Sequence, residues 1–322
     1  MKAIQIHETG GPEVLKLADL PIPEPGPGQV LIRVEATGVN FIEIYFRKGV
    51  YKASLPLVPG SEAAGTVEEL GPGVTGFAAG DAVASVSVVG SYAEYALVPA
   101  ASLVKVPEGL SMEKAAAAML QGMTAHYLAY STFPLKAGET ALVHAGAGGV
   151  GLLMTQIAVR LGVRVIATVS TEAKAELARE AGASDVILYT EKDFVAEVKR
   201  LTGGKGVDVV YDSVGKTTFE QSLDCLRPRG LLALFGASSG PVPPFDLIHL
   251  SGKGSLFVTR PTLWHYIATR AELEWRSGDV LGWAANGTLK LRTEYVYPLA
   301  EAAQAQLDLE ARKTTGKILL EP

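Results

Sequence analysis

A glycine-rich turn between an apolar strand and an apolar helix restricts the possible folds of this chain more than any other segment. The apolar run 141–145 leads into Gly146, Gly148 and Gly151, and a helical pattern over 150–161 follows. Glycines at this G-x-G-x-x-G spacing let the backbone approach a pyrophosphate, which the N–H groups and dipole of a helix N-terminus attract. The motif alone is weak, because glycine-rich turns also serve packing. Its position between a strand and a helix favours dinucleotide binding.

The segments after this turn continue the alternation. Helical patterns such as 172–181 separate short apolar runs that are typical of strands, at 163–169, 185–188, 207–211 and 231–235. Such alternation predicts an α/β fold with a parallel sheet that helices cover on both faces.

The first 120 residues or so are β-rich instead. Glycine and proline separate four β-prone runs, at 30–36, 62–70, 81–87 and 91–98. Strands at this spacing indicate a small barrel or sandwich. An alanine-rich helix then begins after Ser111. The segments beyond Pro261 are predicted to return to this first domain, as a helix over 262–286, a strand over 293–297, a helix from 299 and a strand over 317–320.

The residues after the second strand of the α/β region indicate which dinucleotide binds. An NAD-binding chain usually has an acid there, about 20 residues after the glycine turn, for the ribose hydroxyls. Here Ser170 ends the strand and Lys174 follows one helical turn later. A hydroxyl and an ammonium suit a 2′-phosphate, although Lys174 could also be an ordinary solvated lysine. Glu172 is the nearest acid, but acids are common at a helix start. The pattern favours NADPH.

Composition and charge argue against several other classes of protein. The net charge of −5 disfavours a nucleic-acid or anionic-lipid surface. No apolar run approaches the ~20 residues of a membrane span, and the first residues alternate like a strand rather than a signal peptide. Cys225, the only cysteine, is interpreted as a buried helix residue. The histidines lack metal-ligand spacing and no G-x-S-x-G elbow occurs. We expect a cytoplasmic protein with no metal and no covalent nucleophile.

Six segments occur in an order that points to a known family. They are 10–15 (GGPEVL), 38–45 (GVNFIEIY), 59–65 (PGSEAAG), 211–215 (YDSVG), 222–226 (SLDCL) and 254–261 (GSLFVTRP). With them the whole chain resembles the medium-chain dehydrogenases/reductases. The zinc branch of that family has a ligand cysteine in the second segment and G-H-E in the third, whereas Asn40 and Ser61 stand there in this chain. The structural zinc loop is also absent, so the resemblance is to the zinc-free quinone oxidoreductase branch.

This resemblance implies a GroES-like β-rich catalytic domain, made of residues 1–122 and 260–322, and a Rossmann domain with a doubly wound parallel sheet over 123–259. Besides the three motif glycines, it implies cofactor contacts from Asn40, Tyr45, Thr124, Gly149, Val150, Ser170, Lys174, Tyr189, Ser213, Phe235, Val258 and Arg312. Family segments also contain Gly236, Ala237, Ser238, Thr259 and Arg260, which we include in the candidate cofactor site.

Within this set, Lys174 and Arg312 would hold the 2′-phosphate together with Ser170 and Tyr189. Two positions depart from the family pattern. Ala237 stands where the family often has asparagine, which weakens the expectation of a side-chain contact there, and Ser170 replaces a common glycine.

The activity implied by the resemblance is NADPH-dependent quinone reduction by direct hydride transfer. A quinone is already electrophilic, so positioning and exclusion of water should supply most of the rate. Asn40 and Tyr45 are the expected catalytic side chains, orienting the cofactor or a quinone oxygen. Arg47, Tyr51 and Thr262 are expected to line the entrance.

Two other functions stay open from the sequence. A reductase of activated C=C bonds in enals or enones would use the same fold and cofactor, because pocket shape decides the substrate. The other is a non-catalytic NADPH- or RNA-binding role, as in crystallin-like relatives, although the chain shows no basic–aromatic patch. The resemblance also implies a homodimer. The β-prone run 255–258 could be its sheet edge or an internal strand.

Overall fold

The computed structural model describes all residues, 1–322, as two compact units. Unit 1 comprises Met1–Met123 and Ile267–Pro322, and unit 2 comprises Thr124–Tyr266. The sequence placed the boundaries after residues 122 and 259. Within unit 2, the Tyr266 ring stacks on Tyr127, with the ring centroids 4.3 Å apart.

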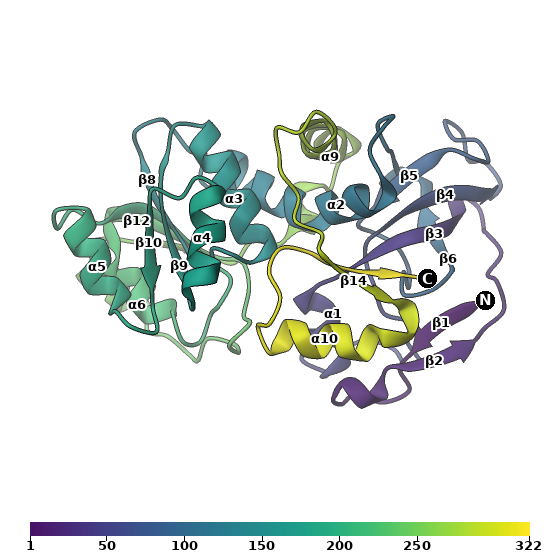
Figure 1. Cartoon of the computed structure of the whole chain (residues 1–322), viewed down its shortest axis with the longest axis horizontal. Helices are drawn as coiled ribbons and strands as arrows, with labels where there is room; N and C mark the ends of the chain where they lie inside the picture. The colour runs from purple at the N-terminus through teal and green to yellow at the C-terminus, as the bar shows by residue number, and fades with distance from the viewer. The chain divides into compact units, whose positions relative to one another are not determined.

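Unit 2 is built on a six-stranded parallel sheet (Figure 1). In chain order its strands are β8 (Thr140–Val143), β9 (Arg164–Val169), β10 (Asp185–Leu188), β11 (Val207–Asp212), β12 (Leu226–Leu234) and β13 (Phe257–Thr259). The spatial order is β10-β9-β8-β11-β12-β13. The first three strands are therefore added toward one edge of the sheet, and the last three are added toward the other edge, starting beside β8. Dinucleotide-binding sheets have this order, and their ligands bind at the carboxyl ends of the strands beside the reversal.

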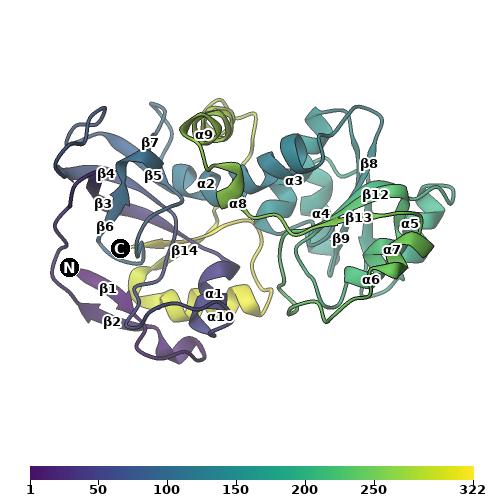
Figure 2. The same cartoon turned by 180° about the vertical axis from the view of Figure 1, so that it is seen from behind.

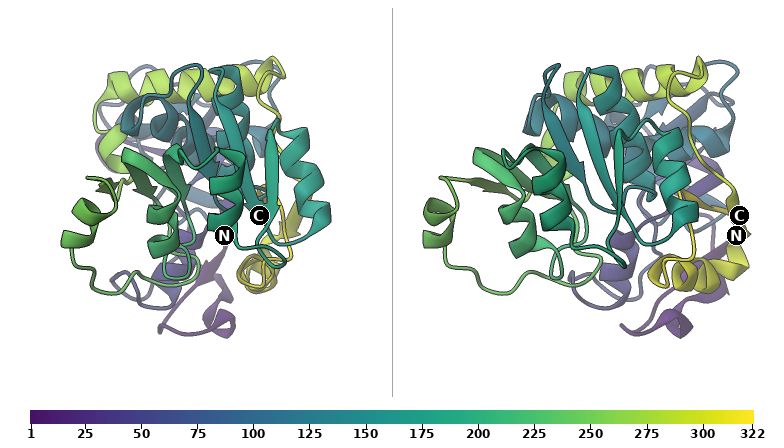
Figure 3. Two further views of the ribbon diagram at one scale, coloured as in Figure 1. Left: turned by 90° about the vertical axis from the view of Figure 1, so that its left-hand side faces the viewer. Right: turned by 60° about the vertical axis from the view of Figure 1, so that its left-hand side comes forward.

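Helices cover both faces of this sheet, as predicted (Figures 1 and 2). The helices α3 (Gly149–Arg160) and α4 (Glu172–Glu180) pack on β8, β9 and β10. On the other face lie α5 (Phe194–Leu201) and α6 (Phe219–Asp224), and Figure 3 gives two further views. Their apolar side chains form one buried core with the sheet, which contains Leu142, Ile166, Phe194, Val198, Val210, Phe219, Leu223 and Cys225. The remaining helical segments of the unit are η3 (Leu128–Thr132), α7 (Ile248–Gly252) and α8 (Leu263–Tyr266).

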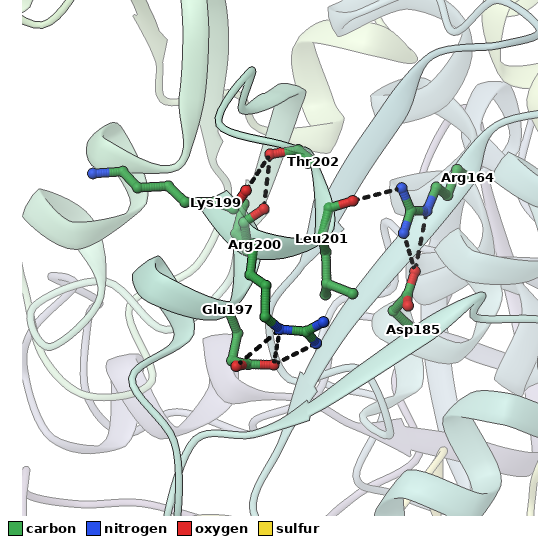
Figure 4. Close-up of polar contacts among 8 residues, drawn as sticks. Arg164, Asp185, Glu197, Lys199, Arg200, Leu201 and Thr202 are labelled. Atoms are coloured by element: carbon green, nitrogen blue, oxygen red, sulfur yellow. Dashed lines mark hydrogen bonds and ion pairs between the residues drawn. The ribbon is translucent and has the colours of Figure 1, made fainter.

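A surface ion pair joins the amino ends of β9 and β10, and a hydrogen bond joins them to α5 (Figure 4). The Arg164 guanidinium donates to Asp185 from Nε at 3.1 Å and from Nη2 at 2.7 Å, and its Nη1 donates to the Leu201 carbonyl at 3.0 Å. Arg200 pairs with Glu197 one turn earlier in α5. These contacts fasten the end of the sheet opposite the carboxyl edge at which a dinucleotide would bind.

Unit 1 is built around the long strand β3 (Gln29–Val39). Antiparallel to it run β4 (Ala63–Leu70), β6 (Tyr95–Pro99) and β15 (Ile318–Glu321). The sheet is extended by β5 (Ala82–Ser85), β7 (Val104–Lys105) and β14 (Tyr295–Pro298), while β1 (Lys2–Gln5) and β2 (Lys16–Asp19) form a separate pair. Because β14 and β15 join the sheet of β3, the segments after residue 290 return to the first domain.

The helices of unit 1 are fewer. They are α1 (Phe41–Arg47), α9 (Arg270–Ala285) and α10 (Ala302–Glu310), with short turns η1 (Pro12–Val14), η2 (Ala100–Ser102) and η4 (Leu299–Glu301). The helix α2 (Met112–Tyr127) begins after Ser111, whose hydroxyl accepts from the Lys114 N–H, and it runs across the boundary of the two units. None of the helices combines the length and the apolar composition that a bilayer span requires.

Two predicted elements were wrong in extent. The single helix expected over 262–286 is divided into α8 and α9, because the Thr269 hydroxyl caps a new helix start by accepting from the Glu272 N–H. The strand expected over 91–98 begins only at Tyr95. Before it, the N–H groups of Ser91 and Tyr92 donate to the carbonyls of Gly60 and Pro59 instead of to a neighbouring strand.

Candidate functional site

The glycine-rich turn follows β8 directly and is tightly packed. A Cβ on Gly151 would lie 2.3 Å from the carbonyl oxygen of Ala145, and a Cβ on Gly146 would lie 2.8 Å from the Cβ of Ala167. Ala145 itself has a φ of 52°, which is unusual for a residue with a side chain. The turn therefore brings α3 close to β8 and β9, as a dinucleotide-binding turn requires.

The start of α3 differs from the starts of the neighbouring helices. Thr171 caps α4 and Asp193 caps α5 with their side chains, and each of these helices has an acid in its first turn. The first residue before α3 is Gly148, which gives no side-chain cap, and its first turn has no acid. Such a helix start suits an anion, and the half-buried backbone of Gly148, Gly149 and Val150 fits the pyrophosphate of a dinucleotide.

Most of the candidate cofactor residues gather at the carboxyl edge of the sheet of unit 2. Ser170 follows β9, Tyr189 follows β10, Ser213 follows β11, and 235–238 follow β12. Val258 and Thr259 belong to the edge strand β13, and Arg260 after it donates to the Leu234 carbonyl at 3.0 Å. Thr124 is buried in α2, at the start of unit 2.

The charges beside Ser170 suit a phosphate better than a ribose hydroxyl pair. Lys174 lies in the first turn of α4, where its N–H donates to the capping hydroxyl of Thr171. Glu172, the acid that could have bound a ribose, pairs instead with Arg179 at 2.5 Å along the exposed side of α4.

A buried histidine, His144, forms hydrogen bonds to two elements next to the glycine-rich turn. The His144 ring nitrogens lie 2.8 Å from the Thr168 hydroxyl and 2.9 Å from the Ser222 hydroxyl. Burial lowers the pKa of His144, against a smaller opposing effect of Asp212, so the ring is neutral near pH 7. Its ring therefore links the end of β8 to β9 and α6 through two hydrogen bonds, two residues before Gly146.

In unit 1, Asn40 belongs to a buried cluster of polar side chains. Its Oδ1 accepts from the Lys317 ammonium at 2.7 Å, and its Nδ2 donates to Glu62 at 2.7 Å. Lys317 also binds Glu62, whose second oxygen accepts from the Leu120 N–H at 2.8 Å. The side chains leave no room above Gly38, where a Cβ would lie 2.0 Å from Glu62. These contacts fix both ends of the Asn40 amide.

Glu43 forms the second part of this cluster. Its carboxylate accepts the Asn40 N–H at 2.8 Å and the Ser61 hydroxyl at 2.7 Å. Burial raises the pKa of Glu43 to about 7, although Ser61 and the Lys317 ammonium lower it. Ser61 thus binds a carboxyl group that can carry a proton near neutral pH.

The other candidate side chains of unit 1 are placed differently. Tyr45 lies on α1 with its ring against Tyr51, at a centroid distance of 5.3 Å. Arg312 is exposed after α10 with a φ of 58°. The expectation that Arg47 lines an entrance was wrong, because Arg47 is completely buried and its guanidinium binds Gln306 and Glu310 of α10.

The sequence analysis did not predict a role in the site for four polar residues of these clusters: Glu43, Glu62, His144 and Lys317. Glu43 and Glu62 lie inside the two segments that carry the family resemblance, so those segments were a usable signal. Lys317 gave no signal, since it is 255 positions from Glu62. In the structure, no three His, Cys, Asp or Glu side chains are grouped so that they could hold a metal ion.

Comparison with known proteins matches both units. Residues 26–108 match the family of alcohol dehydrogenase GroES-like domains, and residues 149–271 match the family described as zinc-binding dehydrogenase. The quinone oxidoreductase of Pseudomonas aeruginosa is 48% identical, over 100% of this chain and 99% of that protein. A 2-haloacrylate reductase of a Burkholderia species is 45% identical, over 99% and 98%. The solved structure of Escherichia coli quinone oxidoreductase complexed with NADPH has a TM-score of 0.98 at 44% identity, over 100% of both chains.

Proposed function

Because the chain belongs to the quinone oxidoreductase branch of the medium-chain dehydrogenase/reductase superfamily, we propose that it is an NADPH-dependent quinone oxidoreductase. The observation that carries this proposal is the similarity to quinone oxidoreductases over the full length of both units, including one complexed with NADPH. The tightly packed glycine turn and the uncapped start of α3 support the cofactor independently of that similarity.

When bound, NADPH supplies the hydride that reduces the quinone. Residues of unit 2 bind and orient most of it. The backbone of Gly148–Gly151 would receive the pyrophosphate at the start of α3, and Ser170 with Lys174 would receive the 2′-phosphate. Tyr189 and Arg312 are assigned to the same phosphate by the family resemblance.

Asn40 and Tyr45 are the proposed catalytic side chains. Asn40 has an amide whose orientation is fixed by Lys317 and Glu62, so it presents a rigid hydrogen-bonding group rather than a mobile one. Tyr45 adds a phenol from the second half of the short helix α1, which Asn40 caps. Their work is to orient the reacting groups, which is where most of the rate of a hydride transfer arises.

Reduction of an activated C=C bond is the second candidate function. The similarity to a 2-haloacrylate reductase favours it, since that protein is nearly as close to this chain as the quinone oxidoreductases are. The two activities share the cofactor and differ in the shape of the substrate pocket.

We also propose a homodimer that acts in the cytoplasm. The strand β13 is the edge of the sheet of unit 2, and Phe257 on it is 60% exposed, as for a strand that pairs with a second copy. A single, buried cysteine and an NADPH requirement fit a reducing compartment.

The function is tested by following the oxidation of NADPH and of NADH with 1,4-benzoquinone, with a chelator present throughout. We expect rapid turnover with NADPH, little with NADH and no effect of the chelator. Turnover of a 2-alkenal or 2-haloacrylate in place of the quinone would decide for the second candidate. Tight NADPH binding without turnover of either substrate would exclude both.

A further inference from the structure

Glu43 and Ser61 form a pair that the proposed hydride transfer does not use. We propose that Glu43 stores the proton that completes the reduction and passes it to the substrate oxygen through the Ser61 hydroxyl. The inference rests on the proposed function, because it assigns the source of the second hydrogen that a quinone must gain.

The backbone fixes which carboxyl oxygen carries the proton. Oε2 of Glu43 accepts the N–H of Asn40 at 2.8 Å, and a backbone N–H can only donate. A protonated Glu43 therefore holds its hydrogen on Oε1. That oxygen lies 2.7 Å from the Ser61 hydroxyl oxygen. The stored proton therefore points at the Ser61 hydroxyl.

The exposure of the two side chains indicates that the proton would move outward, from Glu43 to Ser61. Glu43 is only 2% exposed, whereas Ser61 is half-buried. A hydroxyl donates one hydrogen and accepts others. When Glu43 is ionised, Ser61 donates to it. When Glu43 is protonated, Ser61 accepts from it, and the serine hydrogen is turned toward another acceptor. A substrate oxygen that carries negative charge is the acceptor that this arrangement serves.

The charged neighbours explain why Glu43 rather than Glu62 holds the proton. Glu62 receives three donors, one of them the Lys317 ammonium, with which it forms a buried ion pair. Glu43 receives two uncharged donors. The charge of Lys317 lowers the pKa of Glu43 and the charge of Glu62 raises it. Buried Tyr92, in the segment before β6, interacts electrostatically with Glu43, Glu62 and Arg47. Burial is the largest effect and raises the pKa of Glu43 to about 7.

The step balances in atoms and electrons. Hydride addition gives the quinone two electrons and one hydrogen, leaving a hydroquinone oxygen with a negative charge. That oxygen takes the hydrogen of Ser61, the O–H bond of Ser61 breaks, and the serine oxygen takes the hydrogen from Oε1 of Glu43. Glu43 is left as a carboxylate and is protonated again from water before the next turnover.

The first test measures the stored proton without any cofactor. Infrared difference spectra of the full chain, recorded during a pH titration, should contain a protonated carboxyl band that is lost with a midpoint at about pH 7. The band should be missing in Glu43→Gln and present in Glu35→Gln. Glu35 is a matched control, since it accepts the Thr66 hydroxyl at 2.6 Å in the same unit. A spectrum without a Glu43 band in this range overturns the proposal.

The second test measures kcat for NADPH and 1,4-benzoquinone from about pH 5 to about pH 9. For the wild type, kcat should fall as the pH rises through about 7, because Glu43 loses its proton. Glu43→Gln and Ser61→Ala should lower kcat at acid pH by about 100-fold and abolish this fall. Glu35→Gln and Thr66→Ala should behave as the wild type. If Glu43→Gln does not fold, Ser61→Ala still interrupts the path.

Profiles of both variants that superimpose on the wild type overturn the relay while leaving quinone reduction intact. If the wild type does not oxidise NADPH with a quinone, the proposed function fails and the relay fails with it. The two failures are therefore distinguished by the wild-type rate alone.

Discussion

Lys317 and Glu62 form an ion pair that water does not reach, since their side chains are 2% and 0% exposed. Loss of one partner would leave a buried charge without compensation. We expect Lys317→Met, which keeps most of the side-chain volume, to lower the free energy of unfolding by about 3–5 kcal/mol in a urea titration.

The control for this substitution is Lys253→Met. Lys253 pairs with Asp224, but the two side chains are 30% and 39% exposed. Exposed pairs contribute little, so this variant should lose at most about 1 kcal/mol. Equal losses in the two variants would show that the Lys317 cluster is not protected from water.

Lys174 carries the expected preference for NADPH. If its ammonium binds the 2′-phosphate, Lys174→Ala removes a charge-assisted hydrogen bond that typically contributes about 1.5–3 kcal/mol. The KM for NADPH should then rise about tenfold or more, while the KM for NADH stays the same. Lys192→Ala is the control, since Lys192 lies in the same unit near Glu197. A rise for both cofactors would remove Lys174 from the phosphate site.

Among the elements, α3 depends on one glycine. A side chain at Gly151 would meet the Ala145 carbonyl and push α3 away from β8. We expect Gly151→Ala to lower the unfolding free energy by about 1–3 kcal/mol and to weaken NADPH binding, measured by fluorescence titration.

Gly282→Ala in α9 is the matched control. No atom from outside its own turn of helix lies within 4 Å of its Cβ position, and alanine favours a helix interior by about 1 kcal/mol, so this variant should be as stable as the wild type or more stable. A Gly151→Ala variant that binds NADPH normally would contradict the close packing of this turn.

Local patterns predicted the strand–turn–helix of β8 and α3 because apolar periodicity and glycine spacing act within a few residues. The break between α8 and α9 was missed, although a signal was present. Thr269 and Glu272 have the spacing of a capping box, and both their hydroxyl and carboxyl groups take part in the cap. The late start of β6 had no local signal, because backbone contacts to Pro59 and Gly60 decide it.

For the whole molecule, the proposed dimer depends on the edge strand β13. Phe257→Asp would place two carboxylates close together where a pair of edge strands meets, so we expect it to dissociate the dimer in sedimentation experiments. Leu17→Asp is the control, since Leu17 is also exposed but lies on β2 of unit 1. Dissociation by Leu17→Asp and not by Phe257→Asp would move the interface to unit 1.

The sequence predicted the parts of the site whose residues follow a local pattern. It did not predict the part whose residues are far apart along the chain. The carboxyl-edge residues of unit 2 each follow a recognisable strand, so the order of the strands brings them together. The cluster around Asn40 depends on the pairing of Val39 with Ile318, which no local pattern encodes. That pairing sets Lys317 beside Asn40 and Glu62, and it becomes visible only in the folded sheet.

The division of unit 1 between two stretches of chain has a consequence for synthesis on the ribosome. Unit 2 is continuous, so its sheet can form as soon as residues 124–266 have emerged. Until residues 267–322 follow, β3 has no β15 beside it and Glu62 has no ammonium partner. A nascent chain paused in that interval would have the sheet of unit 2 formed, while unit 1 would lack both its β15 strand and the ammonium that pairs with Glu62.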